Sequence, residues 1–175
     1  HRLPLYLPHP FSIFLTAFDN PAAMGSDLVV GAAAALAIHA PPLIIIDMGT
    51  ATTMTVIDRE ARVLGGAIIP GVGISLEALA NGTSQLPHIS LDAPKKCISS
   101  DTVEAMRSGS VYGTAAMLDG MIERMEAELG EPAAVIATGG LGGCIIPYCR
   151  REITYDKNLL LNGLWALYQK NKRKR

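Results

Sequence analysis

The stretch IIIDMGTATTMTVID, residues 44–58, places a short polar turn between two runs rich in β-branched and apolar residues. The run 43–48 has the length of a buried strand, and residues 52–58 alternate as a half-buried strand does. The short link at Gly49-Thr50 predicts that the two strands pair antiparallel. Asp47 then lies at the hairpin tip, where its carboxylate either bonds to its own turn or holds a cation beside phosphates.

Periodicity, caps and helix breakers predict further elements on both sides of this hairpin. Asn20 or Ser26 is expected to cap a first helix, and Asp101 with Glu104 three residues later resembles the capping box of a long helix. The order from residue 43 onward is β-β-β-α-α-β-α-β-α, which predicts an α/β fold with a mixed sheet and helices on its faces. The expected helices span 20–40, 74–82, 102–129 and 159–170, with a short one after residue 140, and the expected strands span 43–48, 52–58, 62–69, 133–138 and 151–156.

The composition indicates one well-packed domain without a charge that selects a partner. The chain has 175 residues, 49% of them hydrophobic, and a formal net charge of −1, so nothing steers it toward nucleic acid or a membrane. Its three cysteines lack CxxC spacing, which favours a reducing cytoplasm over a disulfide framework or a zinc site.

The apolar window 28–46 is interrupted by His39 and Pro41-Pro42 and predicts a helix and a strand, not a membrane span. A start at His1, without an initiator Met, indicates a fragment or a processed chain.

Three glycine-rich turns follow predicted strands: DMGT at 47–50, GGAIIPG at 65–71 and ATGGLGG at 137–143. Glycine lets a backbone approach a ligand closely, and the last turn opens a helix whose amides and dipole would suit the phosphates or adenosine of a nucleotide. Taken singly, DMGT is typical of a structural hairpin, and ATGGLGG is equally a plain connection of an α/β fold. Three such turns at strand ends together predict one ligand-binding crevice.

DMGTATT, GGAIIPG, TVEAMRSGSVYG (102–113) and ATGG, in this order and spacing, resemble the type III pantothenate kinases of the acetate kinase, sugar kinase, Hsp70 and actin superfamily. The resemblance covers roughly residues 18–169. It implies a ribonuclease H-like, or actin-like ATPase, domain with a mixed five-stranded sheet and helices on both faces. Full kinases of this kind have two such halves. Residues 1–40 are therefore expected to be a remnant of the first half-domain with its linking helix, and 41–175 the second half-domain.

The resemblance also implies a reaction and its cofactors. Family members transfer the γ-phosphate of ATP to the 4′-hydroxyl of pantothenate, the first step of coenzyme A biosynthesis, using Mg2+ and a monovalent cation, K+ or NH4+. They are cytoplasmic homodimers that build the pantothenate pocket across the subunit interface. The glycines of the predicted long helix, Gly109, Gly113 and Gly120, would permit close approach of another backbone.

On the substrate side, the family pattern GADR matches Gly25, Ser26, Asp27 and Leu28. Asp27 inherits the role of the base that takes the hydroxyl proton, although an acid there also favours a helix start. Thr102 and Phe18 match residues that contact pantothenate. Thr102 is equally a first-turn residue of its helix, and Phe18 equally a core aromatic.

On the nucleotide side, Asp47 matches the family's ligand for the monovalent cation. Thr50, with Gly49 beside it, matches a contact to ATP. Gly139 and Gly140 belong to the turn that is expected to bind the same nucleotide.

The sequence departs from the family pattern in two places. Leu28 stands where the family has Arg, and loss of that charged donor would weaken a substrate contact by on the order of 2 kcal/mol. A second phosphate motif, DxGNT, does not occur in these residues, so the isolated chain is expected to show little kinase activity. These departures leave two alternatives: a non-catalytic paralogue that binds a metabolite or a partner in a regulatory role, and a kinase for another small hydroxylated substrate.

Overall fold

A computed structural model of the protein describes residues 25–172. Phe18 and Asn20 lie outside the described residues. The elements are α1 (Ser26–Ile38), β1 (Leu43–Met48), β2 (Ala51–Ile57), β3 (Val63–Pro70), α2 (Val72–Asn81), α3 (Thr102–Leu129), β4 (Ala134–Thr138), α4 (Gly142–Ile145), the short 3-10 helix η3 (Ile146–Tyr148), β5 (Thr154–Tyr155) and α5 (Leu159–Lys172). From β1 onward this order confirms the predicted one.

The strands form one five-stranded sheet in the order β3-β2-β1-β4-β5. The pairs β1–β2 and β2–β3 are antiparallel, whereas β1–β4 and β4–β5 are parallel. A meander of three strands extended by two parallel strands, each reached through a helical crossover, is the ribonuclease H-like arrangement. The predicted mixed sheet and fold class are therefore confirmed.

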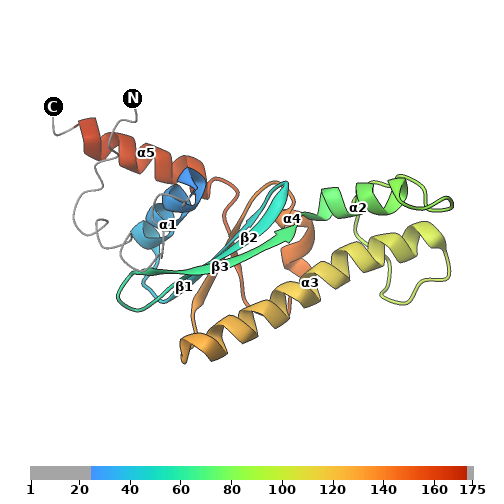
Figure 1. The fold of residues 1–175 in the computed structure, drawn as a ribbon, viewed down its shortest axis with the longest axis horizontal. Coiled ribbons are helices and arrows are strands. Elements are labelled where there is room, and N and C mark those ends of the chain that lie inside the picture. Colours follow the sequence, from blue (N-terminus) through green and yellow to red (C-terminus); the bar gives the residue numbers. More distant parts are fainter. Residues whose placement is uncertain (1–24, 173–175) are drawn as a thin grey trace.

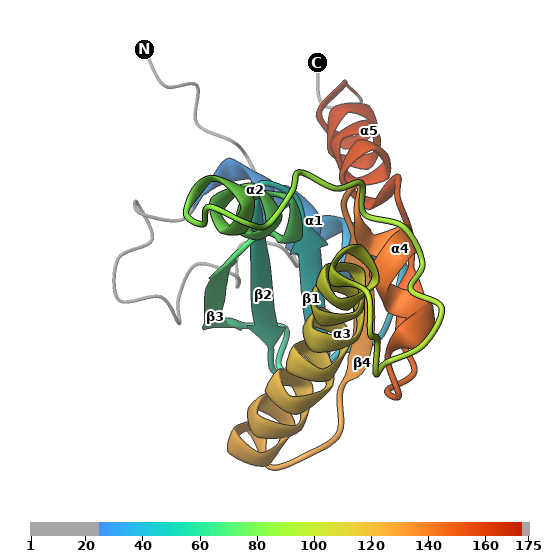
Figure 2. The same ribbon diagram turned by 90° about the vertical axis from the view of Figure 1, so that its right-hand side faces the viewer.

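Alternation along β1 separates two apolar cores. Ile44, Ile46 and Met48 face a core built with α2, α3 and α4. Leu43 and Ile45 face a second core built with α1 and with Leu159 at the start of α5. Figure 1 shows α1 and α5 together on one side of the sheet, and Figure 2 shows α3 crossing its other face. Helices thus cover both faces, and the hairpin tip is left at the edge of these layers.

The helices α1 and α5 pack closely because small residues meet at their contact. Residues 32–35 of α1, all alanine, are buried. A Cβ added at Gly163 of α5 would lie 2.6 Å from Cβ of Ala34 and 2.9 Å from the carbonyl oxygen of Val30. The alanine-rich sequence of α1 therefore reflects a helix that lies between the sheet and α5.

The predicted strand over 151–156 is wrong in length, because β5 contains only Thr154 and Tyr155. The backbone amides of Arg150 and Arg151 instead donate to the carboxylate of Asp119 on α3, at 2.9 and 3.0 Å. The side chain of Arg151 donates to Glu126 and to the carbonyl oxygen of Ala133. These donors are occupied by side-chain and loop acceptors and cannot extend the sheet.

Two predicted caps have different outcomes. Ser26 is the first residue of α1 and not its cap, since Gly25 occupies the N-cap position. At α3 the carboxylate of Asp101 accepts the amide of Glu104 at 3.0 Å, as predicted. The reciprocal half of the capping box is absent among the hydrogen bonds of the described residues, where Glu104 accepts the amide of Lys95 and a guanidinium hydrogen of Arg107.

The expectation that glycines on α3 meet another backbone is not met within the described chain. A Cβ added at Gly109 or Gly113 would find no atom of the described residues within 4 Å. At Gly120 the nearest atom is a guanidinium nitrogen of Arg124 from the same helix, at 3.1 Å. Gly109 and Gly113 therefore lie on an open part of the helix.

Cys97, Cys144 and Cys149 are free thiols. Within residues 25–172, no helix is long and apolar enough to cross a bilayer.

Candidate active site at the hairpin tip

The turn between β1 and β2 is held closed by its own backbone and by the start of α2. The amide of Gly49 donates to the carbonyl oxygen of Ala51 at 3.0 Å, and the amide of Gly71 donates to that of Thr50 at 3.1 Å. A Cβ added at Gly71 would lie 2.3 Å from the carbonyl oxygen of Thr50 and 2.5 Å from that of Gly49. Only glycine fits between the tip and α2 without a backbone shift.

The turn after β4 lies against the end of β1. Gly139 has a φ of +96°, and a Cβ added there would lie 2.5 Å from the carbonyl oxygen of Met48 and 2.6 Å from its nitrogen. The glycine is therefore required both by its backbone conformation and by close approach. Gly49, Gly71 and Gly139 therefore meet at the end of the sheet where β1 ends. The expectation for GGAIIPG is met only at its last glycine, because Gly65 and Gly66 lie within β3, paired with Val56 and Thr55 away from the tip.

Asp47 lies one residue before the end of β1, next to the last pair of the hairpin, Met48 with Thr52. It is paired in register with Thr53 on β2 and with Thr138 on β4, so the three side chains share one face. Asp47 is half-buried, and a Cβ added at Gly49 would lie 4.0 Å from its Oδ1 atom. The carboxylate is thus close to the turn rather than directed away from it.

Thr53 and Thr138 were not predicted as site residues. Their positions in the strands paired with β1 would have indicated that they lie beside Asp47. A single carboxylate with neighbouring hydroxyl and carbonyl oxygens is a donor set that suits a hard cation of low charge. Among residues 25–172, no group of three or more His, Cys, Asp or Glu side chains could hold a metal ion.

The turn Gly139-Gly140 has a second support that the sequence did not reveal. The hydroxyl of Tyr155 on β5 donates to the carbonyl oxygen of Gly139 at 2.7 Å. The helix that follows, α4, has only four residues. Its dipole is too small for the role that the sequence suggested, and the backbone of the turn remains as the candidate for a nucleotide contact.

Asp27 is the second residue of α1, the helix that precedes β1 in the chain. The helix packs against β1 and β2 and is joined to β1 by the short link 39–42. Its 13 residues rise about 20 Å at 1.5 Å each, and the six residues of β1 span about 20 Å. The two elements run in opposite directions (Figure 1), so the first turn of α1 is directed toward the end of the sheet at which β1 ends. The structure describes the backbone, and not the side chains, of Ser26 and Asp27.

Leu28 packs against the core between the sheet and the helices α1 and α5. It stands where the resemblance calls for Arg, and its side chain contributes apolar contacts instead of charged donors. A substrate oxygen near Asp27 would therefore need another donor.

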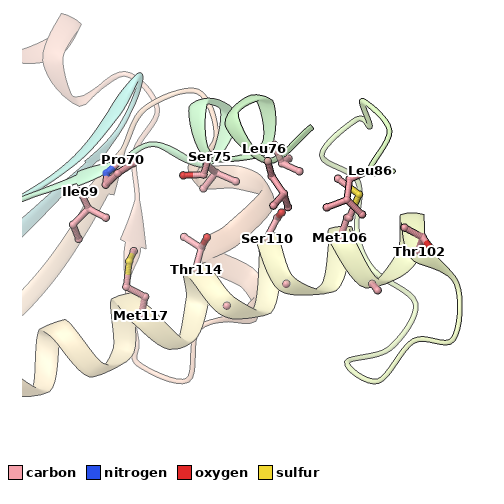
Figure 3. A pocket seen from close by; sticks show the side chains of 15 residues that line it. Ile69, Pro70, Ser75, Leu76, Leu86, Thr102, Met106, Ser110, Thr114 and Met117 are labelled. Atoms are coloured by element: carbon pink, nitrogen blue, oxygen red, sulfur yellow. The ribbon is translucent and has the colours of Figure 1, made fainter. Parts of the chain in front are cut away.

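Thr102 is the first residue of α3. It lies at the end of a groove that is far from the tip of the β1–β2 hairpin. The groove has a volume of about 630 Å3 and runs between α2 and α3. Figure 3 shows Ile69 and Pro70 near one end of it and Thr102 at the other, with the hydroxyls of Ser110 and Thr114 between them. Thr102 is exposed and is not brought beside Asp47 in this chain.

A charged cluster ties the segment before α3 to the start of that helix. Arg107 donates to Glu104 and to Asp92, both at 2.8 Å, and Ser108 donates to the carbonyl oxygen of Cys97 at 2.6 Å. The hydrogen bond from Arg107, followed by that from the amide of Lys95, lowers the pKa of Glu104. The first turn of α3, which carries Thr102, is therefore held in place.

Comparison with known proteins places these features in a family. The family model described as type III pantothenate kinase matches residues 12–124. A type III pantothenate kinase of Exiguobacterium sibiricum is 46% identical over 154 residues, which cover 88% of this chain and 60% of the relative. One of Acidothermus cellulolyticus is 38% identical over 154 residues, with the same two shares. The chain thus spans about 60% of the length of the curated relatives it matches.

A solved structure agrees with the fold. The crystal structure of a conserved Campylobacter jejuni protein, described as a Baf family transcriptional activator, matches with a TM-score of 0.64 and 23% identity and covers 94% of this chain and 71% of that one. At this identity the likeness concerns the fold alone. Taken with the matched family model and the glycine turns around Asp47, the sequence relatives show that the chain belongs to the type III pantothenate kinase family.

Proposed function

We propose that the protein carrying this chain transfers the γ-phosphate of ATP to the 4′-hydroxyl of pantothenate, the first step of coenzyme A biosynthesis. The observation that carries the proposal is the close approach of Gly71 to Gly49 and Thr50, and of Gly139 to Met48, beside Asp47 in a chain of this family. Close-packed backbone of this kind can approach phosphates without side chains in between. Relatives that bear the name pantothenate kinase support the choice of substrate.

In this proposal Asp27 is the general base. Its carboxylate takes the proton of the 4′-hydroxyl as the oxygen attacks the γ-phosphorus, and ADP leaves with the electrons of the broken bond. Phosphoryl transfer depends mainly on position and charge neutralisation, so a single base is sufficient. The direction of α1, which runs opposite to β1 with Asp27 in its first turn, supports this assignment (Figure 1).

The nucleotide lies at the turns Gly49-Thr50 and Gly139-Gly140, whose backbone amides and the hydroxyl of Thr50 contact its phosphates or its nucleoside. Asp47, with hydroxyl or carbonyl oxygens near it, holds a monovalent cation, K+ or NH4+. This cation, and the Mg2+ that accompanies ATP, supply positive charge that neutralises the phosphate oxygens.

The substrate side of the site includes Gly25, Ser26 and Thr102, with Phe18 among the residues before α1. In one chain Thr102 lies at the far end of the groove from the tip. We propose a homodimer in which Thr102 of one subunit contacts pantothenate bound at Asp27 of the other. Gly109 and Gly113, which are open in the described chain, would allow such an approach.

The remaining assignments follow from the same resemblance. Residues 1–40 are proposed to belong to a first half-domain and its linking helix, and 41–175 to form the second, with the protein acting in the cytoplasm. In this proposal α1 is the linking helix, and its buried residues pack in the core between the sheet and α5.

A second candidate function rests on Leu28. Leu28 is partly buried, packs against the apolar core and supplies no charged donor to a substrate. The alternative is therefore a paralogue that binds a metabolite or a partner without turnover.

An ADP-release assay on the full-length gene product, with pantothenate and KCl present, separates the two candidates. Turnover that depends on pantothenate and is lost in Asp27→Asn supports the kinase. Ligand binding without turnover, equal in the wild type and in Asp27→Asn, supports the regulatory protein. Turnover with another hydroxylated compound but not with pantothenate would correct the substrate.

A further inference from the structure

Tyr155 is the residue of β5 that touches the glycine turn after β4. Its strand position is fixed by pairing with Ala137 and by the amide of Asp156, which donates to the carbonyl oxygen of Ala137 at 2.9 Å. From there its hydroxyl reaches two residues along and donates to the carbonyl oxygen of Gly139 at 2.7 Å. The same carbonyl oxygen accepts the amide of Gly142 at 3.3 Å. One acceptor thus joins the strand, the turn and the start of α4.

The ring of Tyr155 lies against the other glycines of the turn. A Cβ added at Gly142 would lie 2.4 Å from Cε2 of Tyr155, and one added at Gly143 would lie 3.5 Å from Cε1. Residue 142 is therefore glycine because the ring occupies the space of a side chain. The turn is in contact with Tyr155 on this side.

On its opposite side the turn is in contact with the end of β1. Gly139 lies so close to the backbone of Met48 that a Cβ would be 2.5 Å from the carbonyl oxygen. The turn is thus clamped between the strand that carries Asp47 and the side chain of Tyr155. A shift of the turn away from β1 is opposed by the ring of Tyr155, and the hydrogen bond from its hydroxyl fixes the carbonyl group of Gly139.

We propose that Tyr155 is a positioning residue for the nucleotide, because its hydroxyl and ring hold the turn 139–143 against the end of β1 beside Asp47. This inference rests on the proposed function, in which that turn contacts ATP. Tyr155 itself does not take part in phosphoryl transfer. Its contribution is to fix the backbone groups of the turn before the nucleotide binds, so that less conformational entropy is lost on binding.

The test is a comparison of Tyr155→Phe with the wild type in the full-length gene product. The substitution removes the hydroxyl and keeps the ring that packs on Gly142 and Gly143, so the fold is retained. Tyr148→Phe is the matched control, since it removes a hydroxyl from the neighbouring η3, where the ring packs edge-on against Tyr112 at 5.3 Å between centroids.

We expect the KM for ATP, and the Kd for ATP from calorimetry, to rise about three- to ten-fold in Tyr155→Phe, the range for one lost hydrogen bond. We expect kcat and the KM for pantothenate to stay within about two-fold, because neither depends on this turn. Tyr148→Phe should leave all these constants unchanged. A purely structural role for Tyr155 would lower the melting temperature and leave the KM for ATP unchanged at temperatures where both proteins are folded.

The outcomes separate this inference from the proposed function. If the wild type binds and uses ATP and Tyr155→Phe has the same KM and Kd for ATP, the positioning role is wrong and the kinase remains. An equal change in Tyr148→Phe would also overturn the positioning role. If the wild type binds no ATP, the proposed function fails and the inference fails with it.

Discussion

The amide of Gly71, at the start of α2, donates to the carbonyl oxygen of Thr50, at the tip of the β1–β2 hairpin, across 3.1 Å. This contact joins two turns that are 21 positions apart in the chain and leaves no space for a side chain at Gly71. With the contact of Gly139 to Met48, it brings Gly49, Gly71 and Gly139 together at the end of β1, where Asp47 lies.

Gly71→Ala is expected to destabilise the protein by about 2 kcal/mol, because a Cβ 2.3 Å from the carbonyl oxygen of Thr50 forces the backbone to shift. Urea unfolding followed by circular dichroism measures the change. Gly73→Ala, two residues along, is the matched control, since its Cβ would meet only the side chain of Leu141 at 3.9 Å and alanine favours the helix by about 1 kcal/mol. Equal stability of Gly71→Ala and the wild type would contradict the close approach described here.

Asp47→Asn is expected to remove the dependence of the rate on K+, because an uncharged amide holds a monovalent cation weakly. Initial rates are measured against KCl, with choline chloride replacing it at constant ionic strength. The wild type should rise with KCl, and the variant should be slow and flat. A variant that keeps the wild-type response to KCl would show that the cation lies elsewhere.

Glu104→Gln is expected to lower the stability of the protein near neutral pH. The pKa of Glu104 in the folded protein is below its usual value of 4.5, chiefly through the hydrogen bond from Arg107 and then that from the amide of Lys95. A carboxyl with a depressed folded-state pKa stabilises the fold above its unfolded-state pKa, and this contribution disappears as the pH falls through the folded-state value. The difference between Glu104→Gln and the wild type should therefore shrink as the pH is lowered below about 4.

Unfolding midpoints measured from pH 3 to 7 check this dependence, with Glu123→Gln, an exposed carboxylate on the same helix, as the control. A stability difference that stays constant over this range would mean that Glu104 does not act through its charge.

Cys149 is expected to react slowly with iodoacetamide in the native protein. Burial, and secondarily the negative charge of Asp119, raise the pKa of this thiol to about 12, so it stays protonated and unreactive at pH 8. Cys97 and Cys144 are exposed. Mass spectrometry of peptides after timed alkylation should show both labelled well before Cys149, and equal rates for all three would contradict its burial.

The sequence predicted the parts of the fold that depend on local patterns. The second strand, the break at Pro70 and Gly71, and the cap of α3 at Asp101 each have a local physical cause, and the structure confirms them. The half-buried alternation expected over 52–58 is wrong for the second half of β2, where residues 54–57 are all buried between the two cores. The strand β5 was predicted too long because the acceptor of the amides at 150 and 151 is Asp119, about 30 residues earlier in the chain. Such long-range partners leave no periodic signal.

The candidate site was predictable to a similar extent. Glycines at strand ends indicated the three turns, whereas Thr53 and Thr138 beside Asp47 follow only from strand register. Tyr155 was missed because a single tyrosine in a short edge strand has no pattern that distinguishes it. The packing of Leu28 into the core likewise depends on α5, which lies far away in the sequence.

The most direct test of the central claim is product analysis of the full-length gene product incubated with ATP, Mg2+, K+ and pantothenate. Mass spectrometry identifies any phosphorylated product, and phosphorus NMR locates the phosphate. We predict 4′-phosphopantothenate from the wild type and none above background from Asp27→Asn that folds like the wild type. Absence of this product from the active, ATP-binding wild type, or its undiminished formation by Asp27→Asn, would contradict the account.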